Sequence, residues 1–450
     1  MKTKAIKICL AVAEAGGTPY ITGGVVRDML MDRPASDVDI EVFGIDRATL
    51  EQILFNVCER VDYVGAQYGI YKADGIDVGF PRRDKGHGKG AEVEVDSMMS
   101  VEEASKRRDL TFNALYFNPF TLEIIDPFNG KFYIKNKVVR HTSASTFHED
   151  PLRPLRAARF AATLGFDIDH TTIGLCRCAD RDKILGLPKD RVFGELKKVL
   201  MEAPKPSVFF EALESMHLLD AVFPELHATK KIEQGAKYHP EGSVYSHTLM
   251  ALDVLLPEER TLEVMVALLL HDFGKISVEA VDRGDGKISF HGHAEATSLA
   301  KTALKRLTDE IELSENVMRL VEFHMTPYNF IKGGVPSVAK KQVRKLAAKI
   351  DLPKLMLVNK ADRLGRGKEA AVKYEAVNMG VASEILRVYE EIKGEIAPLV
   401  QGRDLITAGY APGKHFGEML KRVYEAQLEE EFCTVEDGVK FAKELLKDKE

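Results

Sequence analysis

Two carboxylates near the start of the chain have a spacing that suits metal-assisted phosphoryl transfer. Asp37 and Asp39 are two positions apart in a strand-like run, so both side chains are expected on one face of a sheet. Paired carboxylate oxygens suit Mg²⁺, and such ions activate an attacking hydroxyl and neutralise a triphosphate. Asp77, in a second short apolar run, is a candidate third carboxylate on a neighbouring strand.

A pair of glycines stands just before these carboxylates. Gly23 and Gly24 follow an apolar strand and precede a helical stretch, so backbone and a helix N-terminus can both approach a phosphate. Arg27 and Asp28 lie one turn into that helix. The combination of glycines, arginine and paired aspartates is far more specific than the Asp-x-Asp pattern alone.

A second group of side chains, in the other half of the chain, has the residue types of a metal centre. His271 and Asp272 close an apolar helix, so both can face one cavity. Neutral imidazoles with carboxylates suit Mn²⁺, Ni²⁺, Co²⁺ or Fe²⁺, and Mg²⁺ less well. Asp362 is the best candidate for the last carboxylate, with Asp282 and Asp285 as competitors. The candidate ligands are His247, His271, Asp272, His293, His324 and Asp362.

The elements that must position these groups differ between the two halves of the chain. Up to about residue 140, short β-rich runs such as Val38–Phe43 and Ile76–Phe80 alternate with turns and helical stretches, which predicts a mixed α/β head. Beyond it the 3.6-residue period dominates, which predicts a helical remainder. The expected fold class is α+β. We place domains at residues 1–140, 141–232, 233–375 and 376–450.

Composition excludes several classes of protein. The chain has 450 residues, 45% of them hydrophobic and 29% charged, and a net charge of −6, which is ordinary for a globular protein and argues against global disorder. No run approaches a membrane span, and Glu14 and two glycines follow the basic start too soon for a signal peptide. Five cysteines without a CxxC pair argue against a disulfide framework or a structural zinc site. We therefore expect a cytoplasmic protein.

One window has the opposite charge to the whole chain. Residues 137–200 carry twelve Lys or Arg against eight Asp or Glu, a local balance of about +4. A basic stripe on helices suits a phosphate-bearing partner, although a solvated helix face is an equally good interpretation. A second basic stretch, residues 340–345, is interpreted mainly as solvated helix surface.

The block of residues 20–44 resembles the catalytic motif of the DNA polymerase β nucleotidyltransferase superfamily, in the form found in bacterial tRNA nucleotidyltransferases (CCA-adding enzymes, class II) and poly(A) polymerases. Two further motifs are similar to those of this family. The segment RRDLTFNAL, with Arg107, Arg108, Asp109 and Asn113, resembles a ribose-recognising motif. The segment HEDPLRPLRAARFAATLGF resembles a base-recognising motif.

The base-recognising segment also has a physical interpretation. Arg153, Arg156 and Arg159 recur every three residues and share one helix face, and Pro151 suits the first helical turn. A carboxylate acceptor beside an arginine fork matches the Watson–Crick edges of cytosine and adenine. The resemblance implies that Asp150 and Arg153 act as a protein template for CTP and ATP, helped by Arg156 and Arg159.

The loop between the two strands near residues 80–90 is basic and glycine-rich. Its position matches the flexible loop that takes part in switching from C to A addition in this family. A mobile surface loop without a catalytic role is nearly as good an interpretation.

The histidine–aspartate cluster resembles the HD phosphohydrolase superfamily, and residues 238–243 resemble the HD domain attached to some bacterial CCA-adding enzymes. This resemblance implies phosphomonoesterase, 2′-nucleotidase or 2′,3′-cyclic phosphodiesterase activity, with Mn²⁺, Ni²⁺, Co²⁺ or Mg²⁺ at the site.

The leading hypothesis is template-independent, Mg²⁺-dependent addition of CCA to tRNA 3′ ends, with a head, a helical neck and body, an HD domain and a C-terminal helical region. The implied partners are the tRNA 3′ end, ATP and CTP, and no membrane. Alternatives are a poly(A) polymerase, a CC-adding or A-adding specialist, a protein that is chiefly an HD phosphohydrolase, and a non-enzymatic RNA-binding module. The oligomeric state is not set by the sequence.

Overall fold

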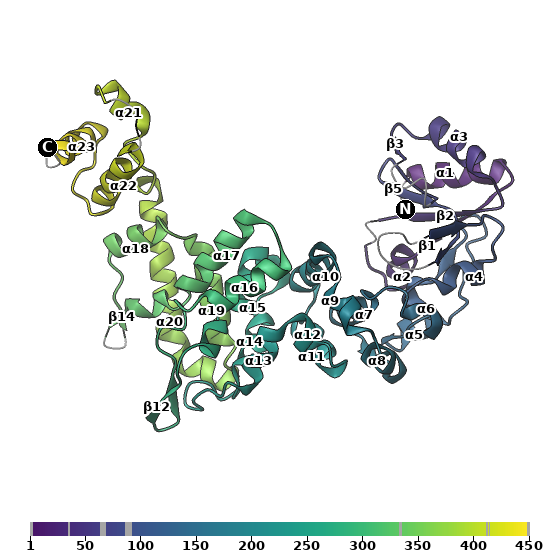
Figure 1. The fold of residues 1–450 in the computed structure, drawn as a ribbon, viewed down its shortest axis with the longest axis horizontal. Helices are drawn as coiled ribbons and strands as arrows, with labels where there is room; N and C mark the ends of the chain where they lie inside the picture. The colour runs from purple at the N-terminus through teal and green to yellow at the C-terminus, as the bar shows by residue number, and fades with distance from the viewer. Residues whose placement is uncertain are drawn as a thin grey trace. The chain divides into compact units, whose positions relative to one another are not determined.

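A computed structural model describes residues 3–34, 37–63, 69–85, 92–332, 335–410, 413 and 415–447. The chain forms two compact units, Met1–Pro224 and Glu225–Glu450 (Figure 1). Each unit contains one of the two groups of candidate functional residues, and the two units are described separately.

The first unit begins with a mixed sheet in the strand order β3-β4-β5-β2-β1-β8-β9. Strand β2 runs antiparallel to β1 and parallel to β5, so the sheet is mixed as the sequence predicts. A separate antiparallel pair, β6 and β7, follows in the chain. The strand bounds are β1 Thr18–Thr22, β2 Asp39–Phe43, β3 Val61–Asp62, β4 Ile70–Ala73, β5 Ile76–Gly79, β6 Arg82–Lys85, β7 Glu92–Val95, β8 Tyr116–Phe117 and β9 Ile124–Ile125.

Successive side chains of β2 point to opposite faces of the sheet, so the strand has one face on the main core and one on the side of the site. Ile40 and Val42 face a core shared with α1 and α3, where they are almost completely buried. On the other face, Phe43 packs with Tyr116 in a second, smaller cluster. The register pairs Asp39 with Thr22 of β1 on one side and with Asp77 of β5 on the other. Asp39 therefore stands in the middle of the sheet, at the strand end where β2 begins.

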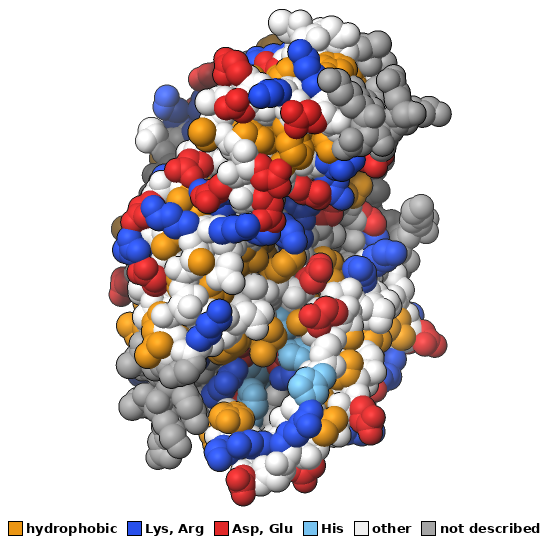
Figure 2. Space-filling view, turned by 90° about the vertical axis from the view of Figure 1, so that its left-hand side faces the viewer, with side chains coloured by type: hydrophobic (Ala, Val, Ile, Leu, Met, Phe, Trp, Pro, Cys, Tyr) orange, Lys and Arg blue, Asp and Glu red, His pale blue; other side chains and the backbone are white. Residues whose placement is uncertain are grey.

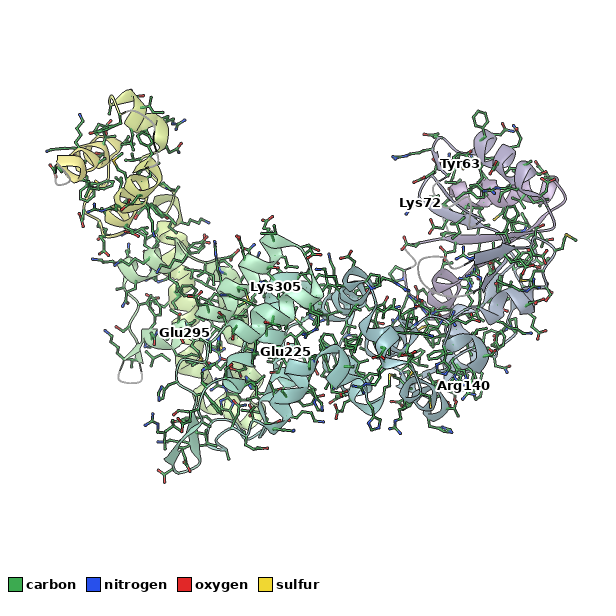
Figure 3. The ribbon with its side chains drawn as sticks, in the orientation of Figure 1. Tyr63, Lys72, Arg140, Glu225, Glu295 and Lys305 are labelled. Carbon is green, nitrogen blue, oxygen red and sulfur yellow. The ribbon has the colours of Figure 1, made fainter. Side chains whose placement is uncertain are left out.

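Helices surround the sheet and then continue the first unit as a helical body. Helix α3 begins at a conventional cap, because the Asp46 carboxylate accepts from the Thr49 N–H at 2.8 Å. Tyr63, labelled in Figure 3, packs edge-on against Tyr71 with ring centroids 5.8 Å apart. The helix bounds in the head are α1 Thr3–Glu14, α2 Gly24–Leu30, α3 Arg47–Val57, α4 Val101–Lys106, η2 Thr111–Asn113, α5 Gly130–Lys135 and α6 Ala144–Phe147.

The body of the first unit is built around α7, which packs against α10 and α11. A short parallel pair, β10 Val138–Val139 and β11 Asp167–Ile168, lies beside it. Arg140, labelled in Figure 3, is bonded to Asp169 at 2.5 Å and to the Thr171 hydroxyl, so part of the basic window is paired within the protein. The helix bounds are α7 Arg153–Leu164, α8 His170–Arg177, α9 Arg181–Leu185, α10 Lys189–Glu202, α11 Ser207–Ser215 and α12 Leu219–Val222, with α13 Pro224–Ala228 at the unit boundary.

The second unit is organised around α15, whose residues Val264–Leu270 are all buried. A helix that is apolar on all sides must be enclosed, and α14, α17 and α19 pack around it. The helix bounds are η3 Thr229–Lys231, α14 Val244–Leu252, η4 Pro257–Glu259, α15 Leu262–Leu270, η5 Phe273–Ile276, α16 Ser298–Leu307, α17 Ile311–Phe323, η6 Thr326–Phe330, α18 Lys340–Ala347, α19 Leu352–Leu364 and α20 Lys368–Ile392. Two hairpins interrupt the helices, β12 Val281–Gly284 with β13 Lys287–Ser289 and β14 Ile331–Lys332 with β15 Val335–Pro336.

The C-terminal helices have a core of their own, which includes Val400, Leu405 and Phe432. The buried Gln427 side-chain amide accepts from Leu399 N and donates to the carbonyls of Glu395 and Ala397. These three bonds hold the backbone of the segment that leads into this cluster. The bounds are η7 Lys393–Glu395, α21 Gly402–Thr407, α22 His415–Leu428 and α23 Val435–Lys447.

Two local expectations need correction. Strand β2 begins at Asp39, so Asp37 precedes the strand. Helix α7 begins at Arg153 with Pro154 in its first turn, so Pro151 stands outside it. The Asp150 carboxylate instead accepts from the Leu152 N–H at 3.0 Å and stabilises the preceding turn. In the part of the chain that the structure describes, no helix is both long and apolar enough to cross a membrane.

Candidate functional site

The candidate residues of the first unit, apart from Asp77, line one open cavity of about 590 Å³. They come from α2 and the glycine before it, from the start of β2 and the residues just before it, from the segment between α4 and β8, and from α7 and the turn before it. The lining includes Gly23, Gly24, Arg27, Asp28, Asp37, Asp39, Arg107, Arg108, Asp109, Asn113, Asp150, Arg153, Arg156 and Arg159. Segments far apart in the sequence thus meet at the site that the motifs predict.

Gly23 is required by the geometry of the cavity. It has φ +79°, and a Cβ atom there would lie 3.1 Å from Asp39 Oδ2. A side chain would therefore strain the backbone and crowd the carboxylate. The glycine leaves the start of α2 and the Asp39 carboxylate open to the same space.

Three carboxylates gather at this end of the sheet. Asp37 and Asp39 line the main cavity, while Asp39 and Asp77 line an adjoining cavity of about 170 Å³. Burial raises the pKa of Asp39, and the neighbouring charges of Asp77 and Asp37 add to the rise, although Arg108 opposes it. Carboxylates that repel one another in this way are a suitable donor set for a divalent cation.

A chain of hydrogen bonds runs along the cavity wall from α2 to α7. Arg27 donates to Asn113 at 2.9 Å, Asn113 donates to Asp109 at 3.0 Å, and Arg156 donates to Asp109 at 2.7 Å. Burial opposes ionisation of Asp109, but Arg156 and Asn113 outweigh it and hold the pKa of Asp109 below its ordinary value. Asp109 is therefore charged and acts as the junction of the chain.

The wall continues through a buried ion pair between two helices. The Arg159 guanidinium on α7 is bonded to Glu195 on α10 and stacks on the Phe160 ring, 3.7 Å from its centroid. Arg156 also lies 3.6 Å from Glu195. This pair locks α7 and α10 together beside the cavity.

Asp150 and Arg153, the predicted pair for base recognition, both line the cavity but are held by other groups. Arg153 donates to the backbone carbonyls of Thr146 and Arg107. Asp150 accepts from Arg191 at 2.7 Å. The backbone contacts give the Arg153 guanidinium one orientation, while Asp150 is partly exposed and paired with a side chain from α10.

Three residues that border the main cavity, Phe160, Lys198 and Glu202, were not predicted as site residues from the sequence. Arg82, from the predicted basic loop, also borders it. Lys198 and Glu202 lie four positions apart on α10, a spacing compatible with one helix face, but nothing in the sequence indicated which face meets α7. The glycine-rich loop extends beyond Lys85 into residues 86–91, which lie outside the described residues.

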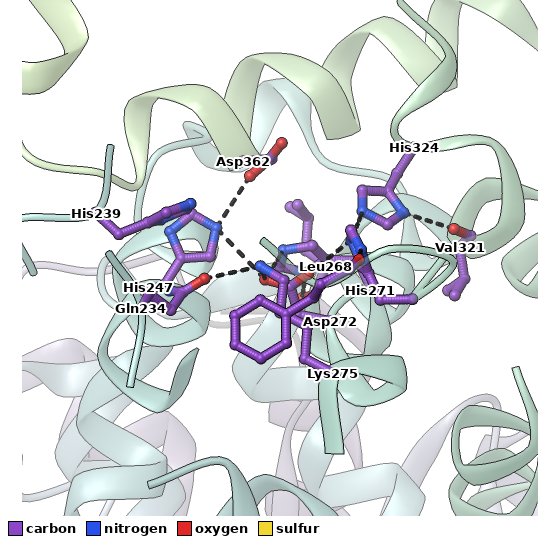
Figure 4. A network of polar contacts seen from close by, with 12 residues as sticks. Gln234, His239, His247, Leu268, His271, Asp272, Lys275, Val321, His324 and Asp362 are labelled. Atoms are coloured by element: carbon purple, nitrogen blue, oxygen red, sulfur yellow. Dashed lines mark hydrogen bonds and ion pairs between the residues drawn. The ribbon is translucent and has the colours of Figure 1, made fainter. Parts of the chain in front are cut away.

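The second unit gathers four histidines around Asp272. Each histidine has its Nδ1 atom bonded to a fixed oxygen: His271 to Leu268 O at 2.7 Å, His293 to Phe290 O at 2.7 Å, and His324 to Val321 O at 2.6 Å. His247 uses the Glu241 carboxylate at 2.8 Å. Such contacts fix the tautomer and direct Nε2 to a common centre, as in metal-binding histidines (Figure 4).

Asp272 stands between two overlapping groups of donors. One group is His247, His271 and Asp272, and the other is Asp272, His293 and His324. His293 Nε2 and His324 Nε2 are 3.3 Å apart. His271 Nε2 and Asp272 Oδ1 are buried and form no hydrogen bond with the described residues. The convergence of these imidazole nitrogens and carboxylate oxygens fits divalent metal ligation.

Asp362 is the carboxylate that completes the cluster. Its Oδ1 lies 3.0 Å from His247 Nε2, and its other oxygen accepts from Tyr328 at 3.0 Å. Asp282 and Asp285 lie exposed on the β12–β13 hairpin, and His291 is bonded there to Arg283 at 2.5 Å. The geometry therefore favours Asp362 over the two competing aspartates.

Burial keeps part of this cluster uncharged. It lowers the pKa of His324 to about 3, and the nearby His271 and His293 add to this effect. Burial also lowers the pKa of His293. Neutral imidazole is the form that binds metal. Figure 2 shows histidine side chains grouped on one face of the molecule.

The basic stretch 340–345 is paired within the second unit. Lys341 and Lys345 both contact Glu429, and Arg344 is bonded to Glu395 at 2.8 Å and Glu430 at 2.6 Å. Basic and acidic side chains alternate on the face drawn in Figure 2. These charges hold α18 against the C-terminal helices and are not a continuous basic surface.

Comparisons with known families divide the chain in the same order as the structure. Residues 19–140 match the "Poly A polymerase head domain", and residues 165–230 match the "Probable RNA and SrmB- binding site of polymerase A". Residues 244–367 match the "HD domain". The chain thus combines a polymerase-type nucleotidyltransferase head, a helical body and an HD domain.

Sequence identity to curated relatives shows which family the chain belongs to. The Alcanivorax borkumensis "Multifunctional CCA protein" is 33% identical over 314 residues, which cover 68% of this chain and 74% of that protein. The chain belongs to the family of the multifunctional CCA proteins. The Stenotrophomonas maltophilia relative is 35% identical over 268 residues, and this match spans 64% of its length.

Solved structures share the fold across the whole chain. A Bacillus stearothermophilus CCA-adding enzyme in complex with CTP superposes with a TM-score of 0.67 at 21% identity, covering 100% of this chain and 99% of that one. A Thermotoga maritima CCA-adding enzyme complexed with tRNA gives a TM-score of 0.59 at 20% identity, covering 99% and 96%. The expected fold class is confirmed.

Proposed function

We propose that this protein adds C, C and A to the 3′ end of tRNA, using CTP and ATP and releasing pyrophosphate. The observation that carries the proposal is the single cavity that gathers the paired carboxylates, the glycine turn and the arginines of α7. The names of the relatives, and the CTP and tRNA bound to the structural neighbours, support the same substrates.

Asp37 and Asp39, with Asp77 beside them, are proposed to hold Mg²⁺. The ion would lower the barrier to attack by the 3′ hydroxyl and neutralise the triphosphate. Gly23 keeps the space beside Asp39 open, and the start of α2 faces it. Arg27 and the basic side chains of the wall are proposed to bind the phosphates.

Base selection is proposed to depend on Asp150 and Arg153. Arg153 is held by two backbone carbonyls, so its guanidinium keeps one orientation without a nucleic-acid template. Asp150 would exchange its Arg191 partner for the amino group of cytosine or adenine. Arg156 and Arg159 are fixed by Asp109 and Glu195 and are proposed to complete the wall.

The test is incorporation of labelled CTP and ATP, each alone and together, into tRNA lacking its 3′ end. Wild type should require CTP first and stop after three nucleotides. Asp39→Asn should reduce incorporation at least a thousandfold, on the order of the loss of a catalytic metal ligand. Asp32→Asn is the matched control, since Asp32 is exposed, has φ +53°, which Asn tolerates, and does not line the cavity.

Product sequencing separates this function from its alternatives. Addition of A without C would indicate a poly(A) polymerase or an A-adding specialist, and products that end after CC would indicate a CC-adding enzyme. Absence of incorporation with Mg²⁺ and with Mn²⁺ would refute the proposal.

We also propose a metal-dependent phosphohydrolase activity for the HD domain. The buried histidine–aspartate cluster favours it, and its residues would hold Mn²⁺, Ni²⁺, Co²⁺ or Mg²⁺. Bound metal would supply a hydroxide nucleophile. The test is hydrolysis of 2′,3′-cyclic nucleotides and phosphomonoesters with each metal. His271→Ala should abolish hydrolysis and leave incorporation intact; activity that persists in this variant would exclude the site.

A cytoplasmic location is part of the same proposal, because the substrates of both activities are nucleotides and RNA ends. Fractionation of cells followed by immunodetection tests it directly, and recovery of the protein with membranes would contradict it.

A further inference from the structure

Glu41 is a buried carboxylate beside the nucleotide cavity that none of the motifs includes. It lies two positions after Asp39 in β2, so both side chains project from the same face of the sheet. Its side chain is 4% exposed and faces a cluster that contains Phe43 and Tyr116. A carboxylate is costly in such surroundings unless partners compensate its charge.

Its partners are two arginines and a tyrosine. Arg107 Nη2 donates to Oε1 at 3.0 Å, and the Tyr116 hydroxyl donates to Oε2 at 2.5 Å. Arg108 Nη2 lies 3.6 Å from Oε2. Burial alone would raise the pKa of Glu41, but Arg108, Arg107 and the hydroxyl hold it below its ordinary value. Glu41 is therefore an anion at neutral pH.

The two arginines that Glu41 contacts also border the site. Both line the main cavity and the adjoining one, next to Asp39. The Nε atoms of both are buried and form no hydrogen bond with the described residues. Asp39, which lines both cavities, also interacts electrostatically with Arg108, and Glu41 is the carboxylate that lies within ion-pair distance of both guanidiniums.

The backbone of these arginines is held independently of Glu41. The Arg107 carbonyl accepts from Arg153 at 2.6 Å, and the Arg108 carbonyl accepts from the Thr142 hydroxyl. Loss of the Glu41 charge should therefore release the guanidiniums while the backbone segment stays in place.

We propose that Glu41 is a positioning residue that holds the Arg107 and Arg108 guanidiniums toward the phosphates of a nucleoside triphosphate bound beside Asp39. This inference rests on the proposed nucleotidyl transfer. The planar guanidinium fork matches phosphate oxygens only in a restricted range of orientations. A buried anion behind the forks restricts that range without occupying the cavity.

The test is equilibrium binding of CTP, pyrophosphate and cytidine in Mg²⁺, without tRNA, to the full-length protein. Glu41→Gln should weaken CTP and pyrophosphate about tenfold each, the loss of roughly one charge-assisted contact, while cytidine binding stays within twofold. Tyr116→Phe is the matched control: it removes a hydrogen bond to Glu41 but keeps the charge, so phosphate binding should change by less than about threefold.

Steady-state kinetics and a second variant complete the test. Glu41→Gln should raise KM for CTP more than it lowers kcat. If Glu41→Gln does not fold, Glu41→Asp, which keeps the charge but retracts it, should show the same selective loss for phosphates. Unchanged pyrophosphate binding, an equal loss for cytidine, or equal effects of Glu41→Gln and Tyr116→Phe would overturn the role of Glu41. Failure of wild type to incorporate CTP while it binds CTP would refute the proposed function instead.

Discussion

The Arg159–Glu195 ion pair joins α7 to α10, and its burial sets the cost of breaking it. The two side chains are 8% and 6% exposed, so removing one partner leaves the other charge in a poorly solvated position. Burial and the nearby Arg156 already lower the pKa of Arg159, which shows that this charge is costly to keep. We expect Glu195→Gln to reduce the free energy of unfolding by about 3 kcal/mol, the lower end for broken buried pairs, because the Phe160 ring still stabilises the cation.

The opposite truncation should cost less. In Arg159→Met, Glu195 keeps Arg156, whose Nη1 lies 3.6 Å away, so we expect a loss of about 1–2 kcal/mol. Once Glu195 is neutral, however, Arg159 is an uncompensated buried charge. Arg159→Met should then stabilise the Glu195→Gln protein by about 1–2 kcal/mol, reversing the sign of its effect.

The free energy of unfolding of all four proteins is measured by urea unfolding. Unfolding is monitored by far-ultraviolet circular dichroism, because the chain has no tryptophan. The free energies of the two single variants and the double variant against wild type form a double-mutant cycle. If Arg159→Met destabilises the Glu195→Gln protein as much as it destabilises wild type, the two charges are not coupled and the reasoning is wrong.

Three further predictions concern other parts of the chain. Burial lowers the pKa of His141 to about 4 in the folded protein. As the pH falls below about 6.5, His141 therefore binds a proton in the unfolded state before it does so in the folded state. His141 should therefore cost about 1–2 kcal/mol of stability between pH 7 and pH 5, and this loss should be absent in His141→Gln when urea unfolding is compared at the two pH values. Asp272→Asn should lower the Mn²⁺ content of the HD domain more than His324→Gln does, by elemental analysis after dialysis, because Asp272 belongs to two donor groups and His324 to one; equal losses would contradict this. Gln427→Ala leaves three backbone groups without their partner and should destabilise the C-terminal helices by about 2–3 kcal/mol, seen as faster hydrogen exchange there with the HD helices unchanged.

Local pattern predicted much of the head and its site. The mixed sheet is confirmed, and Asp39 lies in a strand as the alternation predicts, although Asp37 does not. The element boundaries were predicted less accurately, since β2 begins at Asp39 and α7 at Arg153. Strand and helix ends depend on partners across the fold, such as the pairing of Asp39 with Asp77.

Charges were harder to interpret than apolar periodicity. Lys340 and Lys341 lie on exposed helix surface, as predicted, but Arg344 in the same stretch is buried and paired with Glu395 and Glu430. Arg153 matched a base-recognising motif, yet its guanidinium is bonded to backbone carbonyls. A long flexible side chain meets partners that are distant in the sequence, so its spacing alone does not determine its contact.

The sequence by itself determined the chemical groups of this protein: paired aspartates after a glycine turn, arginines at helical spacing, and a His–Asp pair at the end of an apolar helix. These follow from side-chain type and from periods of two and 3.6 residues, which are local properties. The tertiary structure decided which carboxylate each basic side chain contacts. It joined Asp109 to Arg156, chose Asp362 over Asp282 and Asp285 for His247, and placed Glu41 behind the two arginines, since these contacts bridge residues 47 to 115 positions apart in the chain.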